Sequence, residues 1–500
     1  MSFRTDNHPS MKRFFINLHG PAAAILFAAT LFSFPARAAE KESPAIHINP
    51  AKSWGVWEGW GVSLCWWANV FGDRDDIADA VFTTRITRVE QWEVPGLGLN
   101  IARYNAGGSA GREFDGRRMV VSKIILPYRQ MQGFWLDPKS AAPDSPSWDW
   151  SVDAKQRAML IKARDRGADR FELFSNAPMW WMCANDNPSG AAGKTEVNLL
   201  PGQYQNFAIY LAAIARRAKE KWGISFTTVE PFNEPSADYW FADCKQEGLH
   251  FPPPQQVAFL PYLRAELDRC GLKDLPIAAS DETSYTHGLK SWNAYPASAK
   301  VLVGKVNVHG YEGTKGPRKE LHDAVIRDRK PLWNTEYGEK QADGLQMARC
   351  IHLDLQELRP TAWCYWQAFD HGGWGLFDTD MVNARIKGVN PKYYVLAQYT
   401  RHIRPGMKLL ETGDRAVIAA HDPAARKLVL VVFNDGPARD WSCDLSRFGT
   451  VSGPVTRWVT EPGAAARYEQ RHDIKLAGKS LGCTLSANSI QTFEVENVAP

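Results

Sequence analysis

The feature that most constrains this sequence is a set of eight short apolar or β-branched segments that alternate with longer stretches of helical character. The segments span residues 59–67, 99–105, 170–178, 226–234, 276–282, 305–311, 331–338 and 361–367. Strands that alternate with helices favour a parallel sheet, and eight such units predict a closed (β/α)8 TIM barrel. Between the third and fourth segments, Phe207, Leu211 and Ile214 recur at helical spacing before Gly223, which is typical of an amphipathic helix.

The pattern changes after about Tyr399. Alternating runs joined by turn residues follow, which predicts a small antiparallel β-sandwich. The residues just before the barrel are also β-forming, and we expect them to add a strand to the β-sandwich. The predicted organisation is therefore an N-terminal segment (39–58) that joins the β-sandwich, a catalytic barrel (59–400) and a C-terminal β-sandwich domain (401–500).

Residues 1–38 have the pattern of a secretory signal peptide. Lys12 and Arg13 precede an apolar run, and the small-residue pattern at positions 36–38 predicts cleavage before Ala39. The uninterrupted apolar part is shorter than the ~20 residues that a membrane-spanning helix needs. We therefore expect a secreted or periplasmic protein with no membrane attachment after cleavage.

The charge of the chain disfavours two classes of partner. The whole sequence has a formal net charge of +4, of which residues 1–38 contribute +3, so the mature chain would carry +1. A nearly neutral surface does not favour binding to nucleic acid or to an anionic membrane. A monomer is expected.

The cysteines favour neither a metal nor a cofactor. None of the eight forms a C-x-x-C pair, and this spacing disfavours a zinc site. Cys183 and Cys244 follow the third and fourth predicted strands, and neighbouring loops of one barrel face bring such residues close together. This predicts a disulfide between them, with two free thiols as the alternative.

Two glutamates fall at the ends of predicted strands. Glu234 ends the fourth strand and Glu336 the seventh, 102 residues further on, which fits three barrel units of roughly 31 residues each. Residues at the carboxyl ends of barrel strands point into one bowl, and two opposed carboxylates are what glycosidic cleavage requires. Either glutamate alone would equally fit a helix-capping role, but the pair favours catalysis. Other strand-end carboxylates, for which a structural role is favoured over sugar binding, are Asp281, Glu282 and Asp370.

Motifs spread over residues 54–400 carry a family resemblance. They are GWGVSLCWWANVFG, NIARYNAGGS, SNAPMWWMCANDNPSG, FNEPSADYW, QEGLHF, VHGYEG, NTEYGE and YWQAFDHGGWGLF. Together they resemble glycoside hydrolase family 30, and most closely its endo-β-1,6-galactanase branch. The Asn-Glu-Pro tripeptide recurs across the wider superfamily of retaining barrel glycosidases, whereas the Trp66-Trp67 pair and QEGLHF are more specific to the branch.

The resemblance implies a retaining hydrolase of β-1,6-galactosidic linkages in galactan or arabinogalactan side chains. Glu234 would be the acid/base and Glu336 the nucleophile, with the proton on Glu234 and the charge on Glu336. Arg103 is the candidate cation that lowers the pKa of the nucleophile, or alternatively forms an ordinary buried ion pair. His309 and Tyr311 are expected at the substrate site, with Tyr311 donating a hydrogen bond to the nucleophile.

Further residues are candidate sugar ligands. Asn233 is placed to bond the hydroxyl beside the anomeric carbon, and Glu58 and Asn105 are candidate hydroxyl ligands or structural residues. Four tryptophans at or near strand ends are candidate sugar platforms or core residues: Trp66, Trp67, Trp180 and Trp366. We expect at least one of them to form the floor of the subsite that holds the reacting sugar.

Two alternatives remain open. Another β-linked glycan such as a β-1,6-glucan is a possible substrate, because galactose and glucose differ only in the orientation of one hydroxyl. A non-catalytic glycan-binding protein on the same scaffold is disfavoured by the presence of both glutamates. Whether cleavage is endo or exo depends on loops that the sequence does not define.

Overall fold

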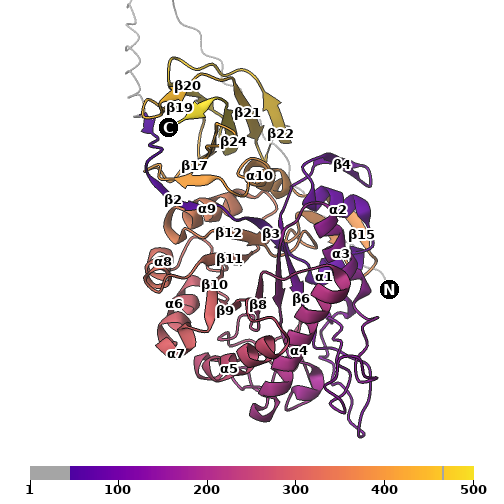
Figure 1. Cartoon of the computed structure of the whole chain (residues 1–500). Helices are drawn as coiled ribbons and strands as arrows, with labels where there is room; N and C mark the ends of the chain where they lie inside the picture. Colours follow the sequence, from indigo (N-terminus) through magenta and orange to yellow (C-terminus); the bar gives the residue numbers. More distant parts are fainter. Residues whose placement is uncertain (1–44, 464–466) are drawn as a thin grey trace, which may run out of the picture. The chain divides into compact units, whose positions relative to one another are not determined.

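The computed structural model describes residues 45–463 and 467–500, so the predicted signal peptide lies outside the described residues. Eight parallel strands form a closed barrel (Figure 1). In order around the barrel they are β10 (Val303–His309), β11 (Leu332–Tyr337), β12 (Ala362–Tyr365), β3 (Gly59–Ser63), β6 (Ile101–Asn105), β7 (Arg170–Phe174), β8 (Thr228–Glu230) and β9 (Ile277–Glu282). Each strand falls within one of the eight segments read from the sequence, or overlaps it, which confirms the (β/α)8 barrel.

Helices lie around the outside of the barrel strands (Figure 1). They are α1 (Cys65–Phe71), α2 (Asp75–Phe82), α3 (Ala154–Asp165), α4 (Tyr204–Arg217), α5 (Pro253–Arg269), α6 (Tyr285–Ala294), α7 (Ala297–Lys300), α8 (Arg318–Arg327), α9 (Leu345–Leu353) and α10 (Pro391–Thr400). The predicted amphipathic helix is α4, in which Phe207, Leu211 and Ile214 are all buried. It continues as a π-helical turn and ends at Gly223, whose φ of 65° is a conformation that glycine adopts without strain.

Strand β8 is shorter than the sequence pattern predicts. It ends at Glu230, four residues before Glu234, because Pro231 has no N–H group with which to extend the ladder. Glu234 itself has a φ of 48°, which is uncommon for a residue other than glycine. Its N–H donates to the carbonyl of Asp281 (2.8 Å), and the Trp240 indole donates to its carbonyl (2.9 Å). These two bonds fix the backbone of Glu234 beside the end of β9.

Two further sheets form the β-sandwich. One contains, in order, β2 (Ser53–Val56), β16 (Lys408–Leu410), β17 (Val417–Asp422), β18 (Lys427–Asn434), β24 (Ser489–Val495), β21 (Val455–Thr460) and β22 (Arg467–Arg471). The other contains β1 (Ile46–His47), β19 (Arg439–Asp444) and β23 (Ser480–Leu485). Strands β1 and β2 precede the barrel in the chain but pair with β19 and β16, which follow it.

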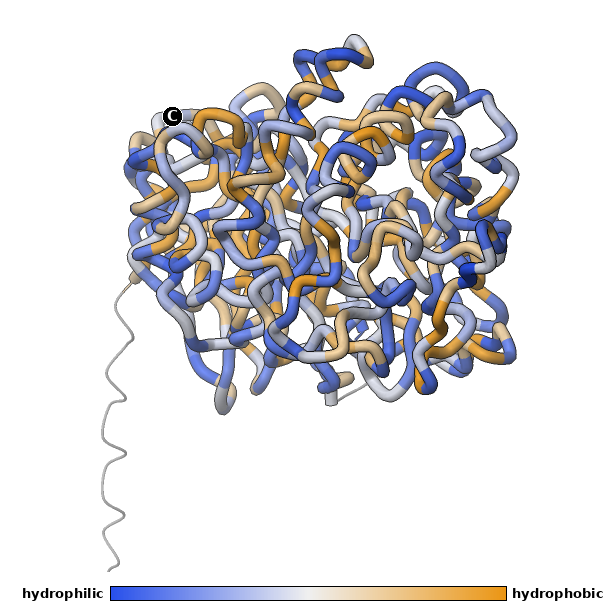
Figure 2. Tube along the Cα trace, turned by 90° about the horizontal axis from the view of Figure 1, so that it is seen from below, coloured by the Kyte–Doolittle hydropathy of each residue, from blue (hydrophilic) through white to orange (hydrophobic). Residues whose placement is uncertain are grey.

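Small sheets complete the described elements. They are formed by β4 (Ile86–Val89) with β5 (Trp92–Pro95), by β13 (Phe369–Asp370), β14 (Phe377–Asp380) and β15 (Arg385–Val389), and by β20 (Thr450–Val451) with β25 (Val498–Ala499). In Figure 2, apolar and polar segments alternate along the chain, as expected for elements that bury one face. Among the helices of residues 45–463 and 467–500, none combines the length and the apolar character needed to cross a bilayer.

Strand β18 contributes to two hydrophobic cores. Leu428 and Leu430 pack in the core between the two sheets of the sandwich, whereas Val429 and Val431 pack in the large core that includes the barrel. Successive side chains of a strand point to opposite faces. The seven-stranded sheet is therefore buried on both faces at β18, and apolar packing joins it to the barrel.

Candidate active site

A cavity of about 740 Å³ lies at the carboxyl ends of the barrel strands. Its lining comes mainly from residues that end a strand or follow it in a loop, as expected for a (β/α)8 barrel. Six of the residues predicted for the site line the cavity: Trp66, Asn233, Glu234, Tyr311, Glu336 and Trp366. The Asn233 side-chain oxygen has no hydrogen-bond partner among the described residues, so it remains available to a sugar hydroxyl.

Arg103, on β6, lies directly beneath the cavity and is completely buried. Its three guanidinium nitrogens each donate to a different carboxylate: Glu172 at 2.8 Å, Asp281 at 2.5 Å and Glu336 at 2.7 Å. Lys305 donates to the second oxygen of Glu172 at 2.5 Å. Every charge of this cluster thus has an opposite charge in hydrogen-bond contact, and the predicted pairing of Arg103 with Glu336 is present in the structure.

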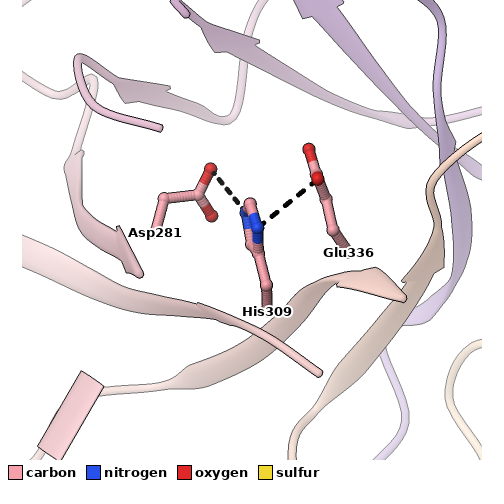
Figure 3. A group of neighbouring side chains, drawn as sticks. All are labelled: Asp281, His309 and Glu336. Atoms are coloured by element: carbon pink, nitrogen blue, oxygen red, sulfur yellow. Dashed lines mark ion pairs between the residues drawn. The ribbon is translucent and has the colours of Figure 1, made fainter. Parts of the chain in front are cut away.

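His309, at the end of β10, lies between the two glutamates. Its Nδ1 is 3.3 Å from Oε1 of Glu234 and 3.4 Å from Oε2 of Glu336, so these two oxygens are at most about 7 Å apart. Its Nε2 faces Asp281 at 3.2 Å without hydrogen-bond geometry, and Figure 3 shows the contacts of His309 with Asp281 and Glu336. Carboxyl groups are ~5–5.5 Å apart in retaining glycosidases and ~6.5–9.5 Å apart in inverting ones. The upper bound is compatible with the retaining arrangement and excludes most of the inverting range.

Each glutamate also accepts a hydrogen bond from a tyrosine. The Tyr311 hydroxyl donates to Oε2 of Glu336 at 3.2 Å, as the sequence predicts. The Tyr239 hydroxyl lies 2.5 Å from Oε2 of Glu234 and 3.3 Å from the Thr283 hydroxyl. Tyr239 therefore has a second partner to which it can donate when Glu234 carries a proton.

Burial and neighbouring charges set the protonation of the cluster. Burial alone would lower the pKa of His309, but the nearby carboxylates, Glu336 first, raise this pKa well above its usual value. Burial raises the pKa of Glu336 to about 7, although His309 and Arg103 oppose the rise. Burial acts in the same direction on Glu234, but hydrogen bonds from His309 and Tyr239 outweigh it and lower the pKa. In the protein without substrate these directions place the proton on Glu336, whereas the sequence analysis placed it on Glu234.

The grouping of Asp281, His309 and Glu336 could hold a metal ion on distance alone, since one possible ligand atom from each lies within 4.8 Å of the others (Figure 3). However, the Arg103 guanidinium already donates to both carboxylates. A divalent cation would have to share these oxygens with a buried positive charge. The arrangement fits charge pairing with Arg103 better than metal coordination.

Two of the four candidate tryptophans belong to the protein core. Trp67 is fully buried and donates its indole N–H to the Ser63 carbonyl at 2.7 Å. Trp180 is also fully buried and packs on Phe114, with ring centroids 5.4 Å apart. Neither residue lines the cavity. Their prediction as sugar platforms is corrected because both side chains turn into the packing beneath the loops.

The two weakest candidate ligands also lie away from the cavity. Glu58 precedes β3 and therefore lies at the amino end of the barrel, where it accepts from the Thr361 hydroxyl at 2.8 Å and faces Arg170 at 3.6 Å. Asn105 ends β6, but its side chain is buried and does not contribute to the cavity lining. The Asn105 N–H donates to the side-chain oxygen of Gln156, and the Asn105 carbonyl accepts from the side-chain nitrogen of Gln156. Glu58 is therefore structural in this fold, and the Asn105 side chain lies outside the cavity lining.

The predicted disulfide is not formed. All eight cysteines fall within the described residues and are free thiols. Hydrogen bonds join the loops after β6, β7 and β8 instead: the Ser122 hydroxyl donates to the Cys244 carbonyl at 2.6 Å, and the Asn187 amide donates to the Ala242 carbonyl at 2.8 Å. The rim of the cavity is therefore held by polar contacts rather than by a covalent bridge.

Several cavity residues were not predicted from the sequence. Tyr239, Arg129 and Trp374 all line the cavity from loops, where no periodic pattern shows which way a side chain points. Trp374 is 37% exposed, which makes it a more accessible aromatic surface than Trp66 or Trp366. Only the motif YWQAFDHGGWGLF, which contains Trp374, could have drawn attention to it.

Comparison with known proteins gives a consistent picture. Residues 43–291 match the model of O-Glycosyl hydrolase family 30. An endo-β-1,6-galactanase of Hypocrea rufa is 45% identical over 474 residues, which cover 94% of this chain and 98% of that protein. An exo-β-1,6-galactobiohydrolase of Bifidobacterium longum subsp. longum is 23% identical over 572 residues, covering 86% of this chain and 37% of that protein.

Solved structures share the fold at low sequence identity. A family 30, subfamily 8 xylanase from Clostridium acetobutylicum superposes with a TM-score of 0.68 at 19% identity, covering 90% of this chain and 99% of that one. An endo-β-1,6-glucanase superposes with a TM-score of 0.62 at 16% identity, covering 93% and 97%. These likenesses support the combination of barrel and β-sandwich.

Proposed function

The chain belongs to glycoside hydrolase family 30, and we propose that it is an endo-β-1,6-galactanase acting on galactan or arabinogalactan side chains. The observation that carries the catalytic part is that Glu234 and Glu336 face one cavity and contact the same nitrogen of His309. The near full-length relative with 45% identity supports the substrate class. The family acts with retention of configuration, and the upper bound on the distance between the two carboxylates is compatible with this.

In the first step, Glu336 attacks the anomeric carbon while Glu234 gives its proton to the glycosidic oxygen. The bond between the anomeric carbon and that oxygen breaks, and the leaving sugar departs with the proton. One oxygen of Glu336 is held by Arg103 at 2.7 Å. The other accepts only the longer bond from Tyr311 and is the oxygen that attacks.

In the second step, Glu234 acts as a base. It takes a proton from a water molecule, whose oxygen attacks the anomeric carbon of the glycosyl-enzyme and displaces Glu336. Two inversions at the same carbon restore the original configuration. Asn233, whose side-chain oxygen has no partner within the described part of the chain, bonds the neighbouring sugar hydroxyl through both steps.

The two glutamates share one proton, and the first step requires it on Glu234. His309 Nδ1 lies within 3.4 Å of both carboxylates, so His309 first gives its Nδ1 proton to Glu234 and then takes the proton of Glu336 on the same nitrogen, which leaves Glu234 protonated and Glu336 ionised. Tyr239 accommodates the change by donating to Thr283 when Glu234 is protonated and to Glu234 when it is ionised. Strongly interacting acids titrate as a pair. Activity therefore requires the form of the pair that carries a single proton.

The choice of galactan over glucan is the finer part of the proposal. An endo-β-1,6-glucanase shares the fold, and its substrate differs from a galactan only in the orientation of one hydroxyl. Hydrolysis of β-1,6-galactan, β-1,6-glucan and xylan should be compared, with product lengths from chromatography and the first-formed anomer from NMR. We expect fastest cleavage of galactan, short internal fragments and a β-anomer. Faster cleavage of glucan would contradict the substrate, and an initial α-anomer would contradict retention.

A non-catalytic glycan-binding protein is the second candidate, and the same assay tests it. Galactan that binds without being cut would support that function instead. We also propose that the protein is exported, on the basis of the signal-like residues 1–38, and that it acts as a monomer. Fractionation of the native host and light scattering of the purified protein test these two points.

A further inference from the structure

A buried arginine at one end of the cavity has no hydrogen-bond partner within residues 45–463 and 467–500. Arg129 ends the short helix η1 (Pro127–Arg129) in the connection between β6 and β7, and only 8% of its surface is exposed. Among the residues that the structure describes, none accepts a hydrogen bond from its guanidinium, and its Nε is completely buried. Burying a cation without a partner is costly. Its position in the cavity lining points to a partner that comes from outside the chain.

Aromatic side chains hold this guanidinium in place. Its central carbon lies 4.2 Å from the centroid of the Trp66 ring, and Trp66 meets Trp366 edge-on with centroids 5.1 Å apart. Stacking engages the face of a guanidinium and leaves its N–H donors, which lie in its plane, free to bond. Arg129 thus offers an oriented set of donors to the cavity.

The order of strands around the barrel indicates which sugar Arg129 faces. Glu234 follows β8 and Glu336 ends β11, whereas Trp366 and Trp66 follow the next two strands beyond β11, namely β12 and β3. The acid protonates the leaving oxygen, so the leaving sugar lies on the side of Glu234. The sugar attacked by Glu336 extends in the other direction, towards Trp366, Trp66 and the guanidinium stacked on it.

We propose that Arg129 recognises the galactosyl unit on this glycone side by donating two hydrogen bonds to neighbouring hydroxyl oxygens, one of them the axial 4-hydroxyl. This inference rests on the proposed function, because the axial 4-hydroxyl is the group that distinguishes galactose from glucose. The guanidinium fork matches two adjacent oxygens. A site built to bond a hydroxyl rejects an analogue that lacks it, since its own buried donors are then left unpaired.

Calorimetric titration of the Glu336→Gln enzyme measures binding without turnover. The ligands are β-1,6-galactotriose and three synthetic versions that each lack the 4-hydroxyl of one unit. In the presence of Arg129, we expect one of the three deletions to weaken binding about 10- to 100-fold. In the Glu336→Gln enzyme that also carries Arg129→Met, the same deletion should change the affinity little, because Arg129 and that hydroxyl form one interaction. Additive losses for the two changes would overturn the proposal.

Two further variants serve as controls. Arg129→Lys keeps a charge over Trp66 but lacks the planar fork, so it should lose most of the preference for the 4-hydroxyl even if Arg129→Met is unstable. Lys245→Met removes another cation that lines the cavity and should leave the effect of the hydroxyl unchanged; an equal loss there would also contradict the proposal.

Two outcomes of the titration separate this inference from the function on which it rests. Failure of the Glu336→Gln enzyme to bind galactotriose at all would contradict the proposed function itself. Much tighter binding of a trisaccharide capped with a uronic acid, dependent on Arg129, would assign the guanidinium to a carboxylate and overturn its role in hydroxyl recognition.

Discussion

Two buried arginines, one beneath the cavity and one in its lining, are in opposite situations. Beneath the glutamates, Arg103 bonds three carboxylates and is completely enclosed. At the glycone end, Arg129 is 8% exposed and stacks on Trp66 without any charged partner within the described chain. The first arrangement fixes the position and charge of a catalytic group before substrate arrives. The second keeps its bonding capacity for the substrate, so burial of a charge alone does not reveal its role.

The largest effect on activity is expected from replacing the two glutamates that lie above Arg103. Glu336→Gln and Glu234→Gln should each lower kcat by about 10⁴-fold or more while leaving the circular dichroism spectrum unchanged. Azide should restore activity to a Glu336→Gly variant, with a product of inverted configuration. Wild-type turnover in Glu336→Gln would show that another residue is the nucleophile.

Removing each arginine should separate the two ends by stability. Arg103→Met leaves buried carboxylates without their cation, which should cost about 3–5 kcal/mol in the free energy of unfolding. Arg129→Met breaks a stacking contact but also removes an unpaired buried charge, so it should cost no more than about 1 kcal/mol. Urea unfolding of both variants measures the difference. Equal losses would mean that Arg129 has a structural partner after all.

Tyr239→Phe tests whether the catalytic end depends on a reversible hydrogen bond. The Tyr239 hydroxyl lowers the pKa of Glu234, so its removal should raise that pKa and move the acidic limb of the pH profile of kcat/KM to higher pH. The alkaline limb, where the pair loses its last proton, should stay near pH 7, the value to which burial raises the pKa of Glu336. We expect kcat to fall about tenfold. Tyr262→Phe, an exposed tyrosine on α5, is the matched control and should leave the profile unchanged.

Trp374→Ala tests the accessible aromatic surface of the cavity. Loss of a stacking contact with sugar worth about 1 kcal/mol should lower kcat/KM by roughly fivefold to tenfold, with little change in Tm. Trp67→Ala removes a fully buried side chain and should instead lower Tm strongly, since such deletions cost about 3–5 kcal/mol. A collapse of Tm in Trp374→Ala would place that residue in the core.

The smallest expected effect concerns the pH dependence of stability and a buried acid, Glu247, that contacts neither arginine. Glu247, in the motif QEGLHF, accepts hydrogen bonds from the Ser109 hydroxyl and the Met131 N–H, and burial raises its pKa to about 8. The folded protein therefore keeps a proton that the unfolded chain releases above its ordinary pKa, and stability falls as pH rises towards 8. Glu247→Gln should reduce the number of protons released on unfolding near pH 6 by about one, as measured from stability against pH. An unchanged slope would show that Glu247 is already ionised in the fold.

The sequence predicted the end of the cavity around Arg103 better than the end around Arg129. Strand periodicity placed Arg103, His309 and Glu336 at the carboxyl ends of barrel strands, where geometry brings them together. Arg129, Tyr239 and Trp374 lie on loops, whose course depends on contacts between distant segments and leaves no periodic signal.

Two differences between the sequence analysis and the structure have identifiable physical causes. Glu58 precedes its strand rather than following it, which in a parallel barrel places it at the end opposite the site; the order along the chain already contained this information. The protonation of the glutamates, by contrast, depends on the balance between burial and the charges around His309. That balance requires distances, which composition and spacing do not provide.

The strand pairing of the β-sandwich also determines the order in which the chain can complete its fold. Strand β2 ends at Val56, and its partner β16 begins at Lys408, about 350 residues later. At a synthesis rate of roughly 5–20 residues per second, β16 is synthesised on the order of 20–70 seconds after β2. During that interval the first strands of the protein have an unpaired edge, and the barrel can assemble before the sheet beside it closes. The earliest residues of the described fold are thus among the last to reach their final contacts.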